Sequence, residues 1–115
     1  MQTTLESSIT FSGVGLHSGK SVSLSIKPAP KNHGILFKRK DIEIGNPIVR
    51  ARWDYVSKTT LCTRVTNEDG TAISTIEHLM AAIAGCGVSN AFIEIDSEEV
   101  PILDGSAAPF VKGIL

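Results

Sequence analysis

Residues 74–87 form the clearest helical pattern in this chain, and they lie between segments that alternate like β-strands. Four apolar side chains recur at i, i+3, i+4 and i+7 and so share one helix face: Ile76, Leu79, Met80 and Ile83. Ser74 is a suitable N-cap, and Gly85 or Gly87 can adopt the left-handed conformation that ends a helix. We therefore expect a helix that starts after Ser74 and packs its apolar face on a sheet.

The opposite side of this expected helix carries an acid and an imidazole next to two alanines. At about 100° per residue, these positions fall away from the apolar stripe: Glu77, His78, Ala81 and Ala82. An ordinary surface helix carries long charged side chains on this side. Alanine lets another backbone approach closely, so this side suits a packed interface. We expect it to lie open, because the element that would cover it is absent from these 115 residues.

The adjacent Glu77 and His78 allow two interpretations. A neutral imidazole is a good zinc ligand, and a neighbouring carboxylate can accept a proton from metal-bound water. Alternatively, Ser74 and Glu77 form a capping box, in which the Glu77 carboxylate accepts a hydrogen bond from the Ser74 N–H. In that case His78 is a solvated surface residue. The direction of the Glu77 carboxylate separates the two interpretations.

Period-two alternation predicts strands in the segments 3–11, 21–26, 34–40, 49–55, 59–66, 71–73 and 90–96. The glycine-rich segment 13–19 precedes a strand and not a helix, so we interpret it as a turn and not as a phosphate loop. His17 is then a structural loop residue. A second helix is expected after Ser106, with Pro109 in its first turn. These elements predict an α+β fold, a multi-stranded sheet with two helices packed on one face as a two-layer sandwich.

Composition narrows the functional classes. A length of 115 residues suits a single domain, and a net charge of −1 gives no electrostatic case for nucleic acid or an anionic membrane surface. No apolar run approaches the ~20 residues of a transmembrane helix, and the first 20 residues lack a signal-peptide core, so we expect a cytoplasmic protein. Cys62 and Cys86 have no CxxC spacing and can form one disulfide or remain free thiols.

Several motifs carry a resemblance to a known family. They are GVGLHSG at 13–19, STIEHL at 74–79 and VPILDGSAAPF at 100–110, and TLCT at 60–63 fits as well. With these motifs in this order, the chain closely resembles the N-terminal domain of the UDP-3-O-acyl-N-acetylglucosamine deacetylases, zinc enzymes of bacterial lipid A biosynthesis. The agreement in order and spacing extends over essentially all 115 residues.

The resemblance implies a reaction and a set of site residues. The reaction is hydrolysis of the 2-acetamido group of UDP-3-O-(3-hydroxyacyl)-N-acetylglucosamine, with release of acetate. By resemblance Glu77 is the general base, His78 is one Zn²⁺ ligand and Asp104 supports the site. Positions that border the acyl chain of the substrate or the metal cleft match Leu16, Thr60, Leu61 and Cys62.

The resemblance also implies that a part of the site lies elsewhere. The family completes its zinc site with a His and an Asp from a second domain, in an H-K-x-x-D motif, and a further His there is the general acid. This motif does not occur in the 115 residues, and the sequence stops on apolar residues within the expected second helix. We therefore expect the N-terminal half of a two-domain deacetylase, with an incomplete zinc site, a missing C-terminal domain as its partner and no activity alone. Two other hypotheses are a non-catalytic binding or interaction module of the same fold and a plain structural domain.

Overall fold

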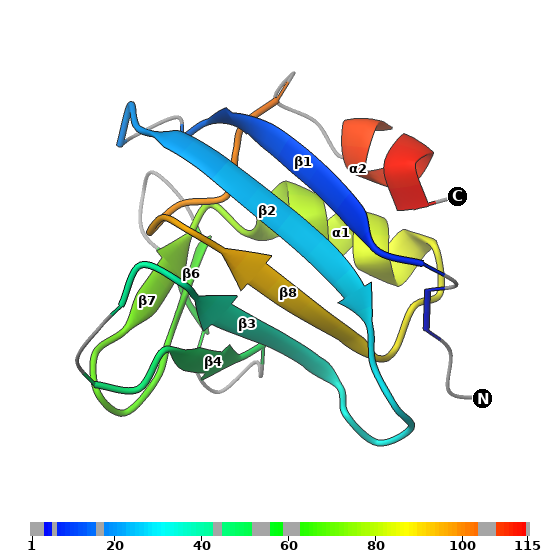
Figure 1. Cartoon of the computed structure of the whole chain (residues 1–115), viewed down its shortest axis with the longest axis horizontal. Helices are drawn as coiled ribbons and strands as arrows, with labels where there is room; N and C mark the ends of the chain where they lie inside the picture. The colour runs from blue at the N-terminus through cyan, green and yellow to red at the C-terminus, as the bar shows by residue number, and fades with distance from the viewer. Residues whose placement is uncertain are drawn as a thin grey trace.

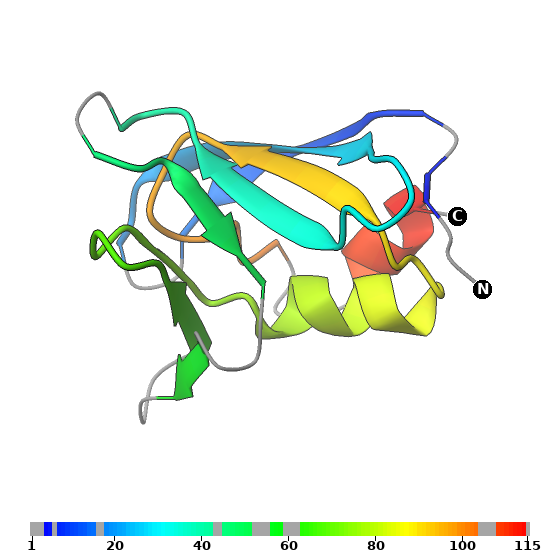
Figure 2. The same cartoon turned by 90° about the horizontal axis from the view of Figure 1, so that it is seen from below.

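A mixed β-sheet forms one layer of the molecule, and two helices cover one of its faces (Figures 1 and 2). The computed structural model describes residues 4–5, 7–15, 18–42, 45–51, 56–58, 63–103 and 108–114. Within these residues the sheet has five strands, in the order β1 (Ile9–Val14), β2 (Ser21–Pro28), β8 (Ala91–Ile95), β3 (Ile35–Arg39) and β4 (Ile48–Arg50). Strand β8 runs antiparallel to β2 and parallel to β3. The expected α+β class with helices on one face is confirmed.

Three further strands form a separate sheet: β5 (Val56–Lys58), β6 (Thr63–Thr66) and β7 (Ala72–Ser74). A tight turn joins β6 to β7, in which the Asn67 N–H donates to the Thr71 carbonyl oxygen at 2.9 Å and Gly70 has a φ of 85°. The expected single sheet is thus divided in two, because alternation predicts strands but not their pairing partners. Trp53 and Tyr55, expected in one strand after Val49, lie outside the described residues.

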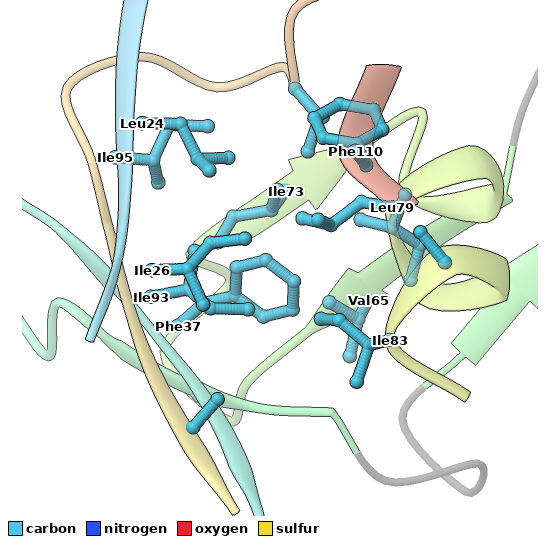
Figure 3. Packing of buried hydrophobic residues seen from close by; sticks show 14 of the residues in the cluster. Leu24, Ile26, Phe37, Val65, Ile73, Leu79, Ile83, Ile93, Ile95 and Phe110 are labelled. Atoms are coloured by element: carbon cyan, nitrogen blue, oxygen red, sulfur yellow. The ribbon is translucent and has the colours of Figure 1, made fainter. Parts of the chain in front are cut away.

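The core lies between the five-stranded sheet and the helices (Figure 3). The register pairs Leu24 with Ile95 and Ile26 with Ile93 across β2 and β8, and Phe37 with Ile93 across β3 and β8. All five side chains are fully buried on one face of the sheet. Burial of such a side chain contributes about 1.5–3 kcal/mol, so this face anchors the helices above it.

Helix α1 (Glu77–Gly85) is the predicted central helix. Its buried arc is centred on Leu79 and includes Ile76, Ile83 and Ala82, whereas Met80 is only partly buried at its edge. The expectation that Ala82 lies open is therefore wrong. The physical reason is that the buried arc is wider than the apolar stripe in the sequence, and Ala82 belongs to the hydrophobic core cluster. The helix ends in a Schellman motif, with Gly87 at a φ of 73° and the Val88 N–H donating to the Ile83 carbonyl oxygen at 3.1 Å.

Helix α2 (Ala108–Ile114) packs against β1 through aromatic side chains. The rings of Phe11 and Phe110 meet edge to face, with centroids 5.0 Å apart. Pro109 lies in the first turn, as predicted, and the proposed cap Ser106 lies outside the described residues. No helix in the described part of the chain is both long enough and apolar enough to span a membrane. Cys86 is a half-buried free thiol, and Cys62 lies outside the described residues.

Candidate functional site

The connection from β7 into α1 differs from the predicted capping box. Ser74 is the last residue of β7, and its N–H donates to the carbonyl oxygen of Glu98 at 2.9 Å. The helix starts at Glu77, with Ile76 at the cap position and no side-chain cap hydrogen bond. The capping-box interpretation is therefore wrong. The Ser74 N–H group, which a capping box would pair with the Glu77 carboxylate, already donates to the Glu98 carbonyl oxygen.

Thr75 makes the sharp turn that directs the chain into α1. Its φ of 62° lies in the left-handed region, which β-branched residues rarely adopt. A residue in this conformation costs roughly 1–3 kcal/mol and persists only where its surroundings enforce it. Thr75 is only 4% exposed, and its hydroxyl donates to the carboxylate of Glu99. The side chains of Glu77 and His78 follow this turn directly.

Glu77 has an unusual environment for a residue in the first turn of a helix. Its side chain is half-buried, and its Oε1 atom is buried without a hydrogen-bond partner among the described residues. A buried acceptor without a partner costs about 1–3 kcal/mol, and more when it is charged. A buried polar atom without a partner in a native fold is explained by a role in catalysis or by a bound water molecule or ion.

His78 and Ala81 complete the side of α1 that we expected to lie open. The side chain of His78 is half-buried, and Ala81 is exposed. With Glu77 half-buried as well, three of the four expected positions retain access to solvent. This side of α1 therefore presents one carboxylate and one imidazole beside a small, exposed residue.

These two side chains fit one corner of a zinc site. An imidazole nitrogen and a nearby carboxylate belong to the donors that zinc prefers, and the unpartnered Oε1 of Glu77 marks a place where a polar group is needed. Across the residues that the structure describes, no group of three His, Cys, Asp or Glu side chains is placed to hold a metal. A catalytic zinc takes three protein ligands. The described residues thus supply only part of such a site.

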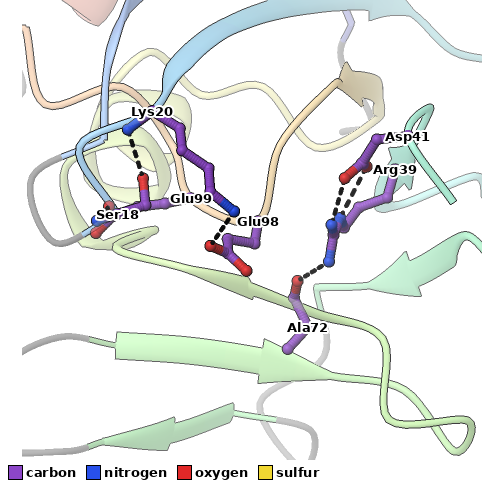
Figure 4. Close-up of polar contacts among 7 residues, drawn as sticks. All are labelled: Ser18, Lys20, Arg39, Asp41, Ala72, Glu98 and Glu99. Carbon is purple, nitrogen blue, oxygen red and sulfur yellow. Dashed lines mark hydrogen bonds and ion pairs between the residues drawn. The ribbon is translucent and has the colours of Figure 1, made fainter.

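Glu99 is the residue of this region that the sequence reasoning missed (Figure 4). It is only 2% exposed, and its Oε1 accepts a hydrogen bond from the Ser18 N–H at 2.9 Å while its Oε2 accepts from the Thr75 hydroxyl. The neighbouring Glu98 faces solvent and forms an ion pair with Lys20 at 3.3 Å. Two adjacent glutamates after a strand are typical of a solvated turn. The one available signal was the position of Glu99 directly before the motif at 100–110.

The glycine-rich segment lies directly against Glu99. It joins β1 to β2, as predicted, and Gly15 pairs in an isolated bridge with Pro101. A Cβ atom at Gly15 would lie 2.5 Å from Oε1 of Glu99, so no larger residue fits there without rearrangement. The Ile102 N–H also donates to the carbonyl oxygen of Val14 at 3.0 Å. The structure thus brings parts of three motifs together at the N-terminal end of α1.

His17, expected to be a structural loop residue, lies outside the described residues. The other predicted site residues also lie outside them: Leu16, Thr60, Leu61, Cys62 and Asp104. Leu16 directly follows Gly15 in the chain, and Asp104 directly follows Leu103. Their roles in binding or supporting the substrate therefore stay predictions.

An acid beside an imidazole, held in the first turn of a helix in an α+β domain, is a pair suited to acid–base or metal-assisted hydrolysis. Comparison with known proteins identifies the family of enzymes to which the chain belongs. The family model LpxC, UDP-3-O-acyl N-acetylglycosamine deacetylase, matches residues 2–115. The chain belongs to this deacetylase family, which confirms the resemblance seen in its motifs.

Individual relatives agree with the family match. The UDP-3-O-acyl-N-acetylglucosamine deacetylase of Shewanella woodyi is 54% identical over 110 residues, and that of Idiomarina loihiensis is 51% identical over 112 residues. The deacetylase of Pseudoalteromonas atlantica is 48% identical over 110 residues. Each alignment covers 96% of this chain and 36% of the relative, so the chain spans about a third of the length of these proteins.

Proposed function

We propose that this chain forms the N-terminal part of a cytoplasmic, zinc-dependent deacetylase of lipid A biosynthesis. Its reaction is hydrolysis of the 2-acetamido group of UDP-3-O-(3-hydroxyacyl)-N-acetylglucosamine. The observation that carries the proposal is the Glu77 carboxylate, half-buried beside His78 with Oε1 unpartnered among the described residues. Membership of the deacetylase family supports the same reaction.

In this proposal Glu77 is the general base. It accepts a proton from the water molecule whose oxygen attacks the carbonyl carbon of the acetamido group. The carbon–nitrogen bond then breaks, acetate leaves and the amine takes up a proton. Glu77 lies at the positive end of the α1 dipole, and its partial burial strengthens its interaction with the developing charge.

His78 would hold a zinc ion through one imidazole nitrogen. A zinc ion, when bound, supplies acidity to water and polarises a carbonyl group. The remaining ligands and the acid that protonates the amine would come from the part of the enzyme that this chain does not span. Because one imidazole and one adjacent carboxylate cannot complete a three-ligand site, we propose that the 115-residue chain alone is inactive. Four side chains would border the substrate, namely Leu16, Thr60, Leu61 and Cys62, and Asp104 would support the site.

The test uses the complete enzyme, meaning the full-length protein that carries this chain. Glu77→Ala should lower kcat by about 10²–10⁴-fold and change KM little, because a general base acts in the transition state. His78→Ala should instead lower the zinc content, measured by atomic absorption. Glu98→Ala is the matched control, because Glu98 is exposed on a neighbouring segment. If Glu77→Ala kept kcat unchanged, Glu77 would not be the base.

A second experiment tests the isolated chain. The purified 115-residue protein should not turn over the UDP-sugar at any zinc concentration. Chelator-sensitive turnover would contradict the incomplete site that we propose.

A further inference from the structure

Glu99 is a buried carboxylate that the proposed reaction does not use. Only 2% of the residue is exposed, so its carboxyl group is removed from water almost completely. A buried polar group is unfavourable unless it is hydrogen-bonded. The donors to Glu99 include the Ser18 N–H at 2.9 Å and the hydroxyl of Thr75. A buried carboxyl group held by donors from separate segments implies a defined geometric role.

The two donors belong to segments that are far apart in the sequence. Ser18 lies in the turn between β1 and β2, 81 residues before Glu99, and Thr75 lies 24 residues before it. Backbone contacts reinforce the link, because Glu99 bridges to Ser74 and Pro101 bridges to Gly15. The Glu99 segment therefore contacts both the turn that contains Ser18 and the residues that lead into α1.

Thr75 connects this arrangement to the reacting groups. Its φ of 62° is an unfavourable conformation for a β-branched residue, and its buried hydroxyl is held by Glu99. Relaxation of Thr75 toward an ordinary φ would rotate the peptide that precedes Ile76. The first turn of α1, which carries Glu77 and His78, would then change direction.

We propose that Glu99 is a positioning residue, which holds Thr75 in its left-handed conformation and thereby aims Glu77 and His78 into the site. The glycine-rich turn is held to the same point, because the absence of a side chain at Gly15 lets the Glu99 carboxylate approach its backbone. This inference rests on the proposed function of Glu77 as the base.

The experiment compares variants of the complete enzyme, loaded with saturating zinc and with rates expressed per folded, zinc-containing molecule. Glu99→Met keeps the side-chain length and removes both acceptors. It should lower kcat by about 10–100-fold with KM within a few-fold, because small misplacements of catalytic groups cost up to about 10²-fold. Thr75→Val should lower kcat in the same way, and Thr75→Ser, which keeps the hydroxyl, should retain it.

A double-mutant cycle tests whether Glu99 acts through Thr75. The combined Glu99→Met and Thr75→Val variant should lose about as much kcat as the more severe single variant. Losses that multiply would overturn the link between the two residues. If Glu99→Met does not fold, the contrast between Thr75→Val and Thr75→Ser decides the question alone, and equal kcat values would overturn the proposal.

The matched control is Glu98→Met, which alters the exposed neighbour and should leave kcat unchanged. If the role of Glu99 is only structural, Glu99→Met should have a lower melting temperature than the natural enzyme and an unchanged kcat per folded molecule. That result would overturn the proposal. Glu77→Ala in the same assay distinguishes a failure of the proposed general base from a failure of the proposed positioning role. If Glu77→Ala is fully active, the proposed base is wrong. If Glu77→Ala is inactive and Glu99→Met is fully active, only the positioning role is wrong.

Discussion

Replacement of Glu77 by methionine should make the 115-residue chain more stable, although it removes a charged residue from the first turn of a helix. Oε1 of Glu77 is buried without a partner among the described residues, and removal of such a group recovers about 1–3 kcal/mol. Loss of the favourable charge at the helix N-terminus costs about 0.3–1 kcal/mol. Met and Glu have nearly equal helix propensities, so that term is close to zero. The expected net gain in the free energy of unfolding is about 1 kcal/mol.

Urea unfolding of the isolated chain, followed by circular dichroism, measures this change. With a slope of about 1–3 kcal/mol/M, a gain of this size raises the midpoint by about 0.5 M. Glu68→Met is the control, because Glu68 is exposed in the β6–β7 turn and its replacement should change stability by less than about 0.5 kcal/mol. If Glu77 belonged to a capping box, its replacement would instead lower the free energy of unfolding by about 0.5–2 kcal/mol. A lower midpoint for Glu77→Met would therefore refute the conclusion that Glu77 is held at a cost in stability.

Three further changes test the fold around the site. Gly15→Ala should cost about 1–3 kcal/mol in urea unfolding, because the new Cβ would fall 2.5 Å from a buried carboxylate oxygen, and an unchanged midpoint would contradict this packing. Arg39→Lys should lower thermal stability by about 1 kcal/mol, since a lysine cannot reproduce both contacts to Asp41 and the hydrogen bond to a carbonyl oxygen of β7. The hydrogen bond from Lys27 holds the pKa of Glu94 below its ordinary value of 4.5, so Glu94 stabilises the fold above that pH and loses this effect as the pH falls through the lowered pKa. The stability difference between the natural chain and Glu94→Gln should be roughly 0.5 kcal/mol at pH 7 and vanish in urea titrations once the pH falls below the lowered pKa of Glu94, and a constant difference would show that the ion pair adds nothing.

The sequence alone determined the local structure of this protein. Alternation predicted the strands that contain Leu24, Ile26 and Ile93, and the helical spacing predicted which side of α1 carries Leu79. The motifs at 13–19, 74–79 and 100–110 predicted the family. The strands and the apolar side of the helix depend on neighbours within a few residues along the chain, and periodicity reflects such neighbours directly.

The tertiary structure decided how the segments meet. It divided the strands between two sheets and buried Ala82 in the hydrophobic core. It also paired the Ser74 N–H with the carbonyl oxygen of Glu98 and not with the Glu77 carboxylate. It also buried Glu99, which accepts hydrogen bonds from a backbone N–H 81 residues away and a hydroxyl 24 residues away. No local pattern predicts such a carboxylate, because the donors that stabilise it become its neighbours only when the chain has folded.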